Sequence, residues 1–295
     1  MRKIKVAIIG TGNIGTDLAE RLLDDDRFAI SAFIGRRKDS EGIKRLEGRI
    51  PGIYSEGASS LEQIIANVDG VFDATSAFDH AKHWEIISHA GKWAVDLTPS
   101  KIGRPAVPAL ASQIPSLGVQ DEFSSNYSMV TCGGQSSAAI VWALSQASKG
   151  LTQVEISSSI ASLSAGPATR RNIDQYVEST ENLLRIVSGI DDVKAILVVN
   201  PAEPPIMMRT TVTVEASELD LEKAKTSVQE ALENVRSYVP GYDLTVDVHE
   251  LSPTSMSATV KVTGAGHYLP EYAGNLDIIN AAAVEMAFRH ERAKQ

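Results

Sequence analysis

The chain has 295 residues, which at roughly 150 residues per domain is enough for about two domains with buried cores. Apolar residues make up 43% of the sequence and charged residues 22%, an ordinary globular composition that argues against extended disorder. The formal net charge of -9 argues against nucleic acid or an anionic membrane as the main partner. The single cysteine, Cys132, excludes an intramolecular disulfide and is typical of a reducing compartment.

The N-terminus runs directly into a short apolar segment and has neither the longer apolar stretch nor the cleavage site of a signal peptide. No run reaches the roughly 18 apolar residues that a membrane-spanning helix needs. We therefore expect a soluble, cytoplasmic protein.

Short apolar segments alternate with amphipathic ones over the first 130 residues, which predicts βαβ units and a parallel sheet. The stretch 80–89 carries His80, His83 and His89, which we expect on a partly exposed helix face, because no Cys or Glu cluster completes a metal site around them. The expected strands are residues 6–9, 29–34, 70–73, 93–96 and 129–131, and the expected helices are residues 14–23, 61–66 and 80–89.

The pattern changes after Cys132, where strand-like stretches are separated by two helices. This order predicts an α+β arrangement with an antiparallel sheet, and the final helix is expected to pack back on the first part of the chain. The expected strands are residues 152–163, 195–199, 210–214, 244–248 and 257–262, and the expected helices are residues 136–148, 172–187, 219–236 and 276–292.

A glycine-rich turn follows the first expected strand and opens the first expected helix, with the sequence Gly10-Thr11-Gly12-Asn13-Ile14-Gly15. This is the context of the GxGxxG dinucleotide-binding fingerprint. The first glycine allows the tight turn, the second lets the backbone approach a pyrophosphate, and the third lets the helix pack on the strand. The alternative is a glycine-rich turn that binds no ligand.

The second expected strand ends in the cations Arg36, Arg37 and Lys38, where the fingerprint usually has a carboxylate for the ribose 2′-hydroxyl. Arginine suits the geometry of a phosphate, so the cations favour a 2′-phosphate and therefore NADP over NAD. The alternative is a solvated loop whose charges point away from the ligand.

Cys132 stands at the end of an expected strand and before Gly133 and Gly134, close to a helix N-terminus. The helix dipole and free amides are expected to lower the pKa of this thiol and favour the thiolate. The two glycines let a ring approach the backbone, and their amides could hold an oxyanion. The alternative is a small buried hydrophobic residue.

Longer motifs run through nearly the whole chain. They are the glycine-rich turn with Thr16-Asp17-Leu18, Asp73-Ala74-Thr75-Ser76, Asp96-Leu97-Thr98-Pro99, residues 129–135, Ser164-Ala165-Gly166-Pro167, Thr169-Arg170, Asn172-Ile173-Asp174, residues 200–205, Tyr238-Val239-Pro240-Gly241-Tyr242, His267-Tyr268-Leu269-Pro270 and residues 272–277. With these motifs in this order, the sequence resembles the acylating acetaldehyde dehydrogenases, the partners of 4-hydroxy-2-oxovalerate aldolases in aromatic meta-cleavage pathways.

The resemblance implies an α/β protein with two domains. A Rossmann-type dinucleotide-binding domain would comprise residues 1–131 and 273–295, and an α+β catalytic and dimerisation domain would comprise residues 132–272. By the resemblance, Cys132 attacks the aldehyde carbonyl, the thiohemiacetal passes a hydride to the nicotinamide, and coenzyme A, as co-substrate, releases the acyl group from the thioester. A covalent intermediate of this kind splits one difficult step into two.

The resemblance also assigns cofactor contacts beyond the fingerprint and the two arginines. It implies contacts to NAD or NADP from Thr11, Gly12, Asn13 and Ile14, from the segment Ser164, Ala165, Gly166, Pro167, Ala168, Thr169, Arg170, Arg171 and Asn172, and from Asn275. Arg170 and Arg171 are candidates to hold a phosphate or an anionic substrate, although solvated surface charge is the alternative for Arg171. No metal site is expected.

Two features depart from the family pattern. Met208-Arg209 is followed by Thr210 where the family has an aspartate, and a threonine hydroxyl cannot take a proton at neutral pH. The stretch between Tyr242 and His267 is shorter than in relatives, which bears on docking of an aldolase partner. We expect a homodimer that oxidises acetaldehyde or another short aldehyde. The alternatives are transfer of the acyl group to water or phosphate, and a nucleotide-binding pseudoenzyme.

Overall fold

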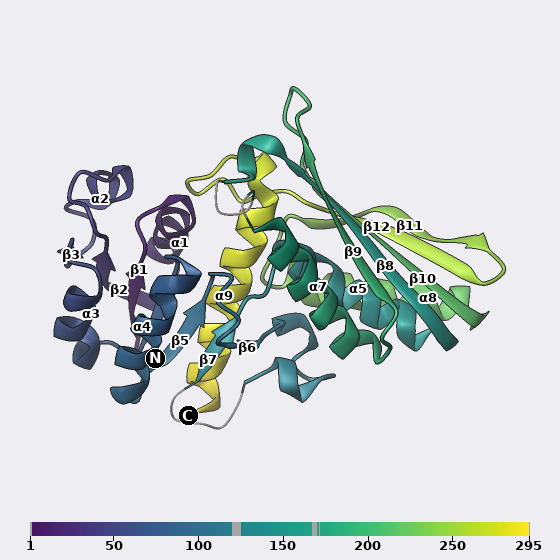
Figure 1. Ribbon diagram of the computed structural model, residues 1–295, viewed down its shortest axis with the longest axis horizontal. Coiled ribbons are helices and arrows are strands. Elements are labelled where there is room, and N and C mark those ends of the chain that lie inside the picture. The colour runs from purple at the N-terminus through teal and green to yellow at the C-terminus, as the bar shows by residue number, and fades with distance from the viewer. Residues whose placement is uncertain (1, 120–124, 167–169, 171, 295) are drawn as a thin grey trace.

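The computed structural model describes residues 2–119, 125–166, 170 and 172–294. These residues form two sheets, and the last helix of the chain, α9 (Gly274–Ala293), lies between them (Figure 1). Among the described residues, no helix combines the length and the apolarity that crossing a membrane requires.

The first sheet has seven parallel strands in the order β3-β2-β1-β4-β5-β7-β6. Its central strands β4 and β5 are buried along their whole length, as expected for parallel strands that are covered on both faces. This confirms the predicted parallel sheet and the α/β fold class. The elements are β1 Ile4–Ile9, α1 Asn13–Leu23, β2 Phe28–Ile34, α2 Glu41–Leu46, β3 Ile53–Tyr54, α3 Ala58–Ile64, β4 Gly70–Asp73, α4 Ala77–His89, β5 Trp93–Asp96, β6 Arg104–Pro105 and β7 Asn126–Ser128.

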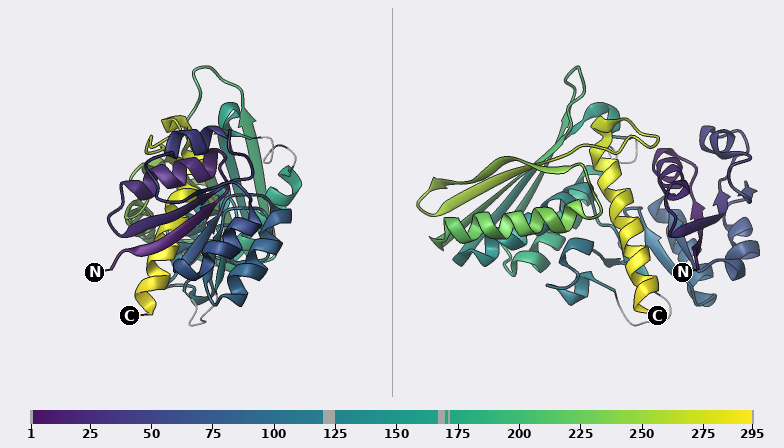
Figure 2. Two further views of the ribbon diagram at one scale, coloured as in Figure 1. Left: turned by 90° about the vertical axis from the view of Figure 1, so that its left-hand side faces the viewer. Right: turned by 180° about the vertical axis from the view of Figure 1, so that it is seen from behind.

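The second sheet has five strands in the order β11-β12-β10-β8-β9. Four of them are antiparallel as predicted, but β9 runs parallel to β8, so the sheet is mixed. Helices α5, α7 and α8 cover one face of this sheet (Figures 1 and 2). The elements are α5 Cys132–Gln146, β8 Ser148–Ala161, α7 Ile173–Ser188, β9 Val193–Asn200, β10 Met208–Leu219, α8 Leu221–Arg236, β11 Tyr242–Ser252 and β12 Ser255–Val262. Short 3-10 helices fill connections at Ile65–Asn67, Pro108–Leu110, Pro115–Leu117, Ser162–Ser164 and Glu271–Ala273.

The connection into the second half differs from the prediction. Strand β7 ends at Ser128, and residues 129–131 are not a strand, because Val130 has a φ of 58° and breaks the extended conformation. Helix α5 begins at Cys132 and not at residue 136, because the Thr131 side chain caps it by accepting a hydrogen bond from the Gly134 amide at 2.9 Å. Cys132 is therefore the first residue of a buried helix.

Helix α9 ties the ends of the chain together, as the sequence predicted. Its Asn280 side chain donates to the Asp17 carboxylate of α1 at 2.8 Å, and its Asp277 pairs with Arg21. Asp17 also accepts hydrogen bonds from the amides of Tyr268 and Leu269 at 3.1 and 2.9 Å. These contacts fix the segment before α9 against the glycine-rich turn that opens α1.

His80 and His83 of α4 are buried, so the expected partly exposed face is wrong for these two histidines, whereas His89 is exposed. The Asp73 carboxylate at the end of β4 accepts from His80 Nδ1 at 2.9 Å and from His83 Nδ1 at 2.8 Å, while His80 Nε2 lies 3.5 Å from Asp96 Oδ2. Burial favours the protonated form of Asp73, but the hydrogen bonds from His80 and His83 outweigh it and lower the pKa of this carboxyl to about 2.

The hydrogen bond between Asp73 and His80 has the opposite effect on the pKa of the His80 imidazole. Burial disfavours the charged form of His80, but the carboxylates of Asp73 and Asp96 raise its pKa above the ordinary value. The stabilisation from charged His80 is therefore fully present below the ordinary histidine pKa and is lost as the pH rises through the folded-state value. The stabilisation from Asp73 is present above the ordinary aspartate pKa and is lost as the pH falls towards 2.

Replacing Asp73 with Asn should lower the free energy of unfolding at pH 6 by about 3–5 kcal/mol, because it removes the carboxylate that His80 and His83 both contact and leaves His80 only Asp96, at 3.5 Å. The difference from wild type should shrink as the pH falls from 4 to 2, since Asp73 becomes protonated in that window. Urea denaturation at several pH values measures both effects. The control is Glu218→Gln, which removes an exposed partner of Lys149 and should change little. Equal losses in the two variants would contradict the assigned role of Asp73.

Candidate active site

The glycine-rich turn between β1 and α1 packs directly against the segment that follows β4. Gly10 has a φ of +113°, and a Cβ at this residue would lie 2.4 Å from the carbonyl oxygen of Ala74. A Cβ on Gly15 would lie 1.9 Å from the carbonyl oxygen of Gly10, whereas Gly12 faces open space before the helix. The turn thus requires the first and third glycines for packing and leaves the second open to a ligand, as the fingerprint predicts.

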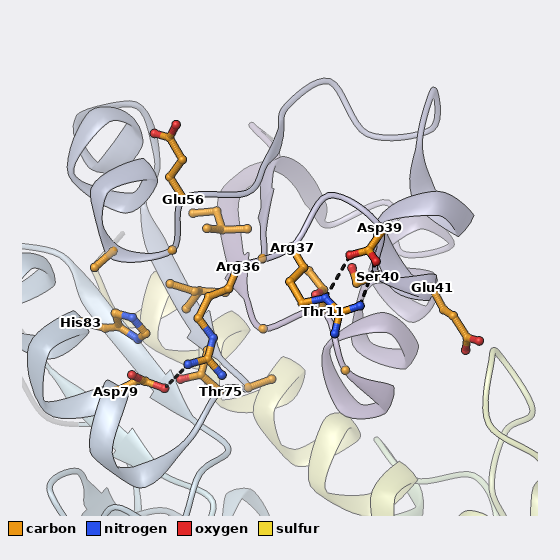
Figure 3. A pocket seen from close by; sticks show the side chains of 18 of the residues that line it. Thr11, Arg36, Arg37, Asp39, Ser40, Glu41, Glu56, Thr75, Asp79 and His83 are labelled. Carbon is orange, nitrogen blue, oxygen red and sulfur yellow. Dashed lines mark hydrogen bonds and ion pairs between the residues drawn. The ribbon is translucent and has the colours of Figure 1, made fainter.

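A pocket of about 780 Å³ opens beside this turn (Figure 3). Thr11 and Gly12 line it on one side, and Arg36 and Arg37 line it beyond the end of β2. Its described lining residues also include two lysines and four carboxylates, at Lys44, Lys82, Asp39, Glu41, Glu56 and Asp79. The pocket is therefore of mixed charge and not strongly basic.

Both predicted arginines reach this pocket, but each has an acidic partner (Figure 3). Arg37 forms two hydrogen bonds with Asp39, at 3.0 and 2.8 Å, which raise the pKa of its guanidinium above the ordinary value. Arg36 Nη1 lies 3.5 Å from Asp79 Oδ2, and its side chain is 78% exposed. Lys38 does not line the pocket. A 2′-phosphate would have to compete with Asp39 and Asp79 for these cations.

A second pocket, of about 170 Å³, surrounds Cys132. It shares Ala74 and Thr75 with the larger pocket, so the two adjoin at the segment after β4. Its walls are mostly apolar, and its described lining residues include no Asp, Glu, Lys, Arg or His. The apolar lining residues are Ile14, Ala74, Leu97, Pro99, Met129, Val130, Leu276 and Ile279.

The Cys132 thiol is partly exposed in this pocket, with Sγ 3.7 Å from the hydroxyl of Tyr176. Burial raises the pKa of the thiol to about 11, against smaller opposing effects from the Tyr176 hydroxyl and the Gly133 amide. The expected lowering of the thiol pKa is therefore wrong for this state of the protein, because the apolar walls disfavour the thiolate. The Gly134 amide, expected to be free for an oxyanion, already donates to Thr131.

Val130 was not singled out from the sequence, yet it lines the pocket beside Cys132 in an unusual conformation. Its φ of 58° lies in the left-handed region, which a β-branched side chain rarely adopts. The Val130 amide donates to the Ser128 hydroxyl at 3.2 Å and helps to hold this conformation. Strain of this kind gathers at functional sites, and here it turns the chain from β7 into the helix that carries the thiol.

Asn275 lies at the start of α9, lines the same small pocket as Cys132 and is buried. Its Nδ2 reaches the carbonyl oxygen of Ser164 at 3.5 Å, while its Oδ1 has no partner among the described residues. Thr98, after β5, lines the same pocket, and its buried hydroxyl also has no hydrogen-bond partner among the described residues. A buried polar atom without a partner is costly, so both atoms are suited to meet a polar ligand.

The other predicted cofactor positions are distributed as follows. Ile14 and Asn172 line the Cys132 pocket, and Asn13 is exposed at the first turn of α1. Arg170 folds back onto the carbonyl oxygens of Ala165 and Ser162, so it does not point into either pocket. Buried Ser164 and Ala165 and exposed Gly166 lead into that turn. Pro167, Ala168, Thr169 and Arg171 lie outside the described residues.

Thr210, in the place of the family aspartate, is buried under the thiol-bearing helix and does not line the pocket. Its hydroxyl lies 2.8 Å from that of Ser136 and 3.0 Å from that of Ser158. It contacts other hydroxyls and not the thiol, so Tyr176, which the sequence analysis missed, is the side chain that meets Cys132.

Comparison with known proteins gives a consistent result. Residues 132–270 match the family model described as prokaryotic acetaldehyde dehydrogenase, dimerisation, and residues 5–114 match that of the semialdehyde dehydrogenase NAD binding domain. The acetaldehyde dehydrogenase of Pectobacterium atrosepticum is 42% identical over 284 residues, which cover 96% of this chain and 94% of that protein. That of Spirochaeta aurantia is 42% identical over 295 residues, covering 99% of this chain and 96% of the relative.

The chain belongs to the acetaldehyde dehydrogenase family. It is accordingly an oxidoreductase with a nicotinamide dinucleotide-binding domain. Aspartate semialdehyde dehydrogenase II of Vibrio cholerae, solved in complex with ASA, has the same fold: its TM-score is 0.65 at 14% identity, with 99% of each chain covered. The family membership predicted from the sequence motifs is thus confirmed.

Cys132→Ala should abolish hydride transfer and leave dinucleotide binding nearly intact, because the thiol lies in the small pocket and not in the larger one. In wild type without ligands, iodoacetamide should label Cys132 at pH 7 at least about tenfold more slowly than a small free thiol, since a pKa of about 11 leaves little thiolate. The chain has one cysteine, so all label reports on this residue. Substantial turnover in the alanine variant would remove Cys132 as the nucleophile.

Proposed function

We propose that this protein oxidises a short, uncharged aldehyde, acetaldehyde above all, to its acyl-coenzyme A, with Cys132 as the nucleophile. The observation that carries the proposal is the position of the Cys132 thiol. It stands at the first turn of α5 in a small apolar pocket that adjoins the dinucleotide cleft. A thiol there can reach both an aldehyde in the small pocket and a nicotinamide at the junction of the two.

Polar atoms of the small pocket and of the glycine-rich turn fit a nicotinamide dinucleotide. The unpartnered Oδ1 of Asn275 is suited to accept a hydrogen bond from a carboxamide NH₂, and the Thr98 hydroxyl offers a second polar contact. Gly12, with open space around its Cα, and the amides at the start of α1 suit the pyrophosphate. When bound, the nicotinamide supplies the acceptor for the hydride.

The size and polarity of the pocket argue for a small neutral substrate. A volume of about 170 Å³ leaves room for little more than a short aldehyde. An acidic semialdehyde would need a cation for its carboxylate, and the described lining residues of this pocket include no lysine, arginine or histidine. This favours acetaldehyde or a near homologue over substrates of the semialdehyde class.

The chain's own residues divide the chemistry between them. Cys132 attacks the carbonyl carbon and afterwards holds the acyl group as a thioester. The apolar walls, including Val130, Leu97 and Ile279, limit the access of water to that thioester. We infer that coenzyme A takes the acyl group. Transfer to water or phosphate is the alternative function, favoured by the buried hydroxyl of Thr210 in place of a carboxylate that could activate the entering thiol.

We also propose a preference for NADP over NAD. Arg36 and Arg37 stand beyond the end of β2 with no carboxylate at the strand end itself, which supports a contact to a 2′-phosphate. Two factors limit the preference. Asp39 and Asp79 compete for the guanidinium groups, and both arginine side chains are largely exposed, so salt screens them.

For the assembly, we propose two domains, at residues 1–131 with 273–295 and at 132–272, and a homodimer formed through the second. The face of the five-stranded sheet that carries no helix is a suitable surface (Figure 2). Along β10, Thr211 and Thr213 alternate with buried Thr210 and Val212 and are only partly buried, which places them on the face away from α5. A reducing, cytoplasmic compartment would keep Cys132 as a thiol.

Turnover with acetaldehyde should yield reduced cofactor and acetyl-coenzyme A in equal amounts. Without coenzyme A, only a burst of about one reduced cofactor per site should appear, because the thioester is not released. The efficiency should fall with increasing aldehyde chain length. Stopped-flow absorbance and product analysis measure these quantities. Steady turnover to a free acid without coenzyme A, or to an acyl phosphate with phosphate, would favour the alternative acceptor. If no aldehyde is oxidised, the proposed activity is wrong and the nucleotide-binding pseudoenzyme is the remaining alternative.

Wild type should use NADP with a kcat/KM about tenfold above that for NAD, the low end expected for screened, charge-assisted contacts. The double variant Arg36→Ile with Arg37→Asp should reverse this ratio, because a carboxylate repels the 2′-phosphate. Lys38→Ile is the matched control, since Lys38 lies outside the pocket. Equal efficiencies in wild type that the double variant does not change would mean that the two arginines do not contact the cofactor.

A further inference from the structure

Tyr176, on the first turns of α7, brings a phenol hydroxyl to the reacting sulfur. Its oxygen lies 3.7 Å from Cys132 Sγ, within hydrogen-bonding range for sulfur, and its ring lines the small pocket. Helix α7 packs against α5, so the contact joins two helices and not two neighbours in sequence. Among the described residues that line this pocket, Cys132 and Tyr176 are the only titratable side chains.

Behind Tyr176, a chain of hydroxyl groups runs under α5. The Ser158 hydroxyl lies beside that of Tyr176: a Cβ on Gly133 would be close to both oxygens, and Ser158 acts on the pKa of the phenol. Ser158 Oγ lies 3.0 Å from Thr210 Oγ1, which lies 2.8 Å from Ser136 Oγ, and Ser136 donates to the Gly133 carbonyl oxygen at 3.1 Å. Ser136 gives its one proton to the Gly133 carbonyl oxygen, which can only accept, so the hydroxyl chain points towards that carbonyl and Ser158 accepts from Tyr176. With a thiol present, Cys132 donates to Tyr176; with a thiolate, Tyr176 can turn its O–H from Ser158 to the sulfur.

The backbone of α5 is shaped to admit the phenol. A Cβ on Gly133 would lie 2.1 Å from the Tyr176 hydroxyl oxygen and 3.0 Å from Ser158 Oγ. Only glycine at this position lets the hydroxyl reach the helix N-terminus beside the thiol. The packing of Tyr176 thus explains the glycine at position 133 independently of any approach of a substrate or a nicotinamide ring.

We propose that the Tyr176 hydroxyl is a catalytic group, which donates a hydrogen bond to Cys132 Sγ whenever that sulfur is a thiolate. This happens twice in the reaction proposed above, on which the kinetic part of the inference rests. It happens first when the nucleophile forms and again when coenzyme A displaces it. Tyr176 thus makes a direct polar contact with the sulfur. A side chain at position 210 does not, because the hydroxyl groups of Ser158 and Tyr176 stand between Thr210 and the sulfur.

The phenol proton is conserved in both steps. When the nucleophile forms, the S–H bond of Cys132 breaks, the proton leaves to solvent, and Tyr176 turns its O–H from Ser158 to the sulfur. In deacylation, the thiolate of coenzyme A bonds to the acyl carbon, the bond from that carbon to Cys132 Sγ breaks, and the electron pair stays on Sγ. Burial raises the pKa of Tyr176 well above its ordinary value, which keeps the phenol protonated as a donor.

The ionisation of Cys132 tests the first half directly. The chain has one cysteine, so ¹³C at its Cβ gives one resonance whose chemical shift follows the protonation of this thiol. Tyr176→Phe keeps the ring and removes the hydroxyl. It should raise the midpoint of the Cys132 titration by about one pH unit, because the thiolate loses a hydrogen bond. Ser158→Ala removes the acceptor that competes with the sulfur for the phenol proton, so it should move the midpoint slightly downward. Tyr238→Phe, which removes a buried hydroxyl elsewhere, should not move it.

Kinetics test the second half. Tyr176→Phe should slow the coenzyme A-dependent steady rate about tenfold and preserve the burst amplitude, while dinucleotide affinity stays unchanged. Gly133→Ala, whose Cβ displaces the hydroxyl, should reproduce the shift in the ionisation midpoint and serves as the test if the phenylalanine variant does not fold. An unchanged midpoint in folded Tyr176→Phe or Gly133→Ala would overturn the inference. A shifted midpoint in a protein that does not oxidise aldehydes would refute the proposed function and leave the thiol contact standing.

Discussion

The carboxylate of Asp73 holds the segment on which both pockets depend. It accepts hydrogen bonds from the amide and the hydroxyl of Thr75 on one oxygen and from His80 and His83 on the other. Ala74 and Thr75 form the shared wall of the two pockets, and Gly10 packs on the Ala74 carbonyl oxygen. One buried anion at the end of β4 therefore holds the segment that the larger pocket and the thiol pocket share.

The second constraint comes from the opposite end of the chain. Helix α9 is held on α1 by Asp17 and Arg21, and this contact brings Asn275 into the lining of the Cys132 pocket. The small pocket is thus built by α1, by the segments that follow β4, β5 and β7, and by α5, α7 and α9, which are widely separated in sequence. Neither half of the chain encloses the thiol by itself, so the integrity of the site depends on the packing between the two sheets.

These long-range contacts explain where prediction from sequence succeeded and failed. The turn at Gly10, the position of Cys132 before a helix and the parallel sheet depend on local patterns, and the structure agrees with them. The burial of His80 did not follow from its own helix, because its partners Asp73 and Asp96 lie on two strands. Tyr176 carried no local signal: it meets the thiol only because α7 packs on α5.

The thiol pKa failed as a prediction for a different reason, and the reason bears on mechanism. The helix N-terminus at Cys132 was recognised from the sequence, but the apolar walls that oppose it were not, since they come from five distant segments. Burial that raises the pKa of the thiol to about 11 leaves little thiolate at neutral pH. The same apolar walls restrict the access of water to the sulfur. A thiolate in such a pocket would therefore need a hydrogen-bond donor from the protein itself, and the Tyr176 hydroxyl, 3.7 Å from Sγ, is placed to supply one.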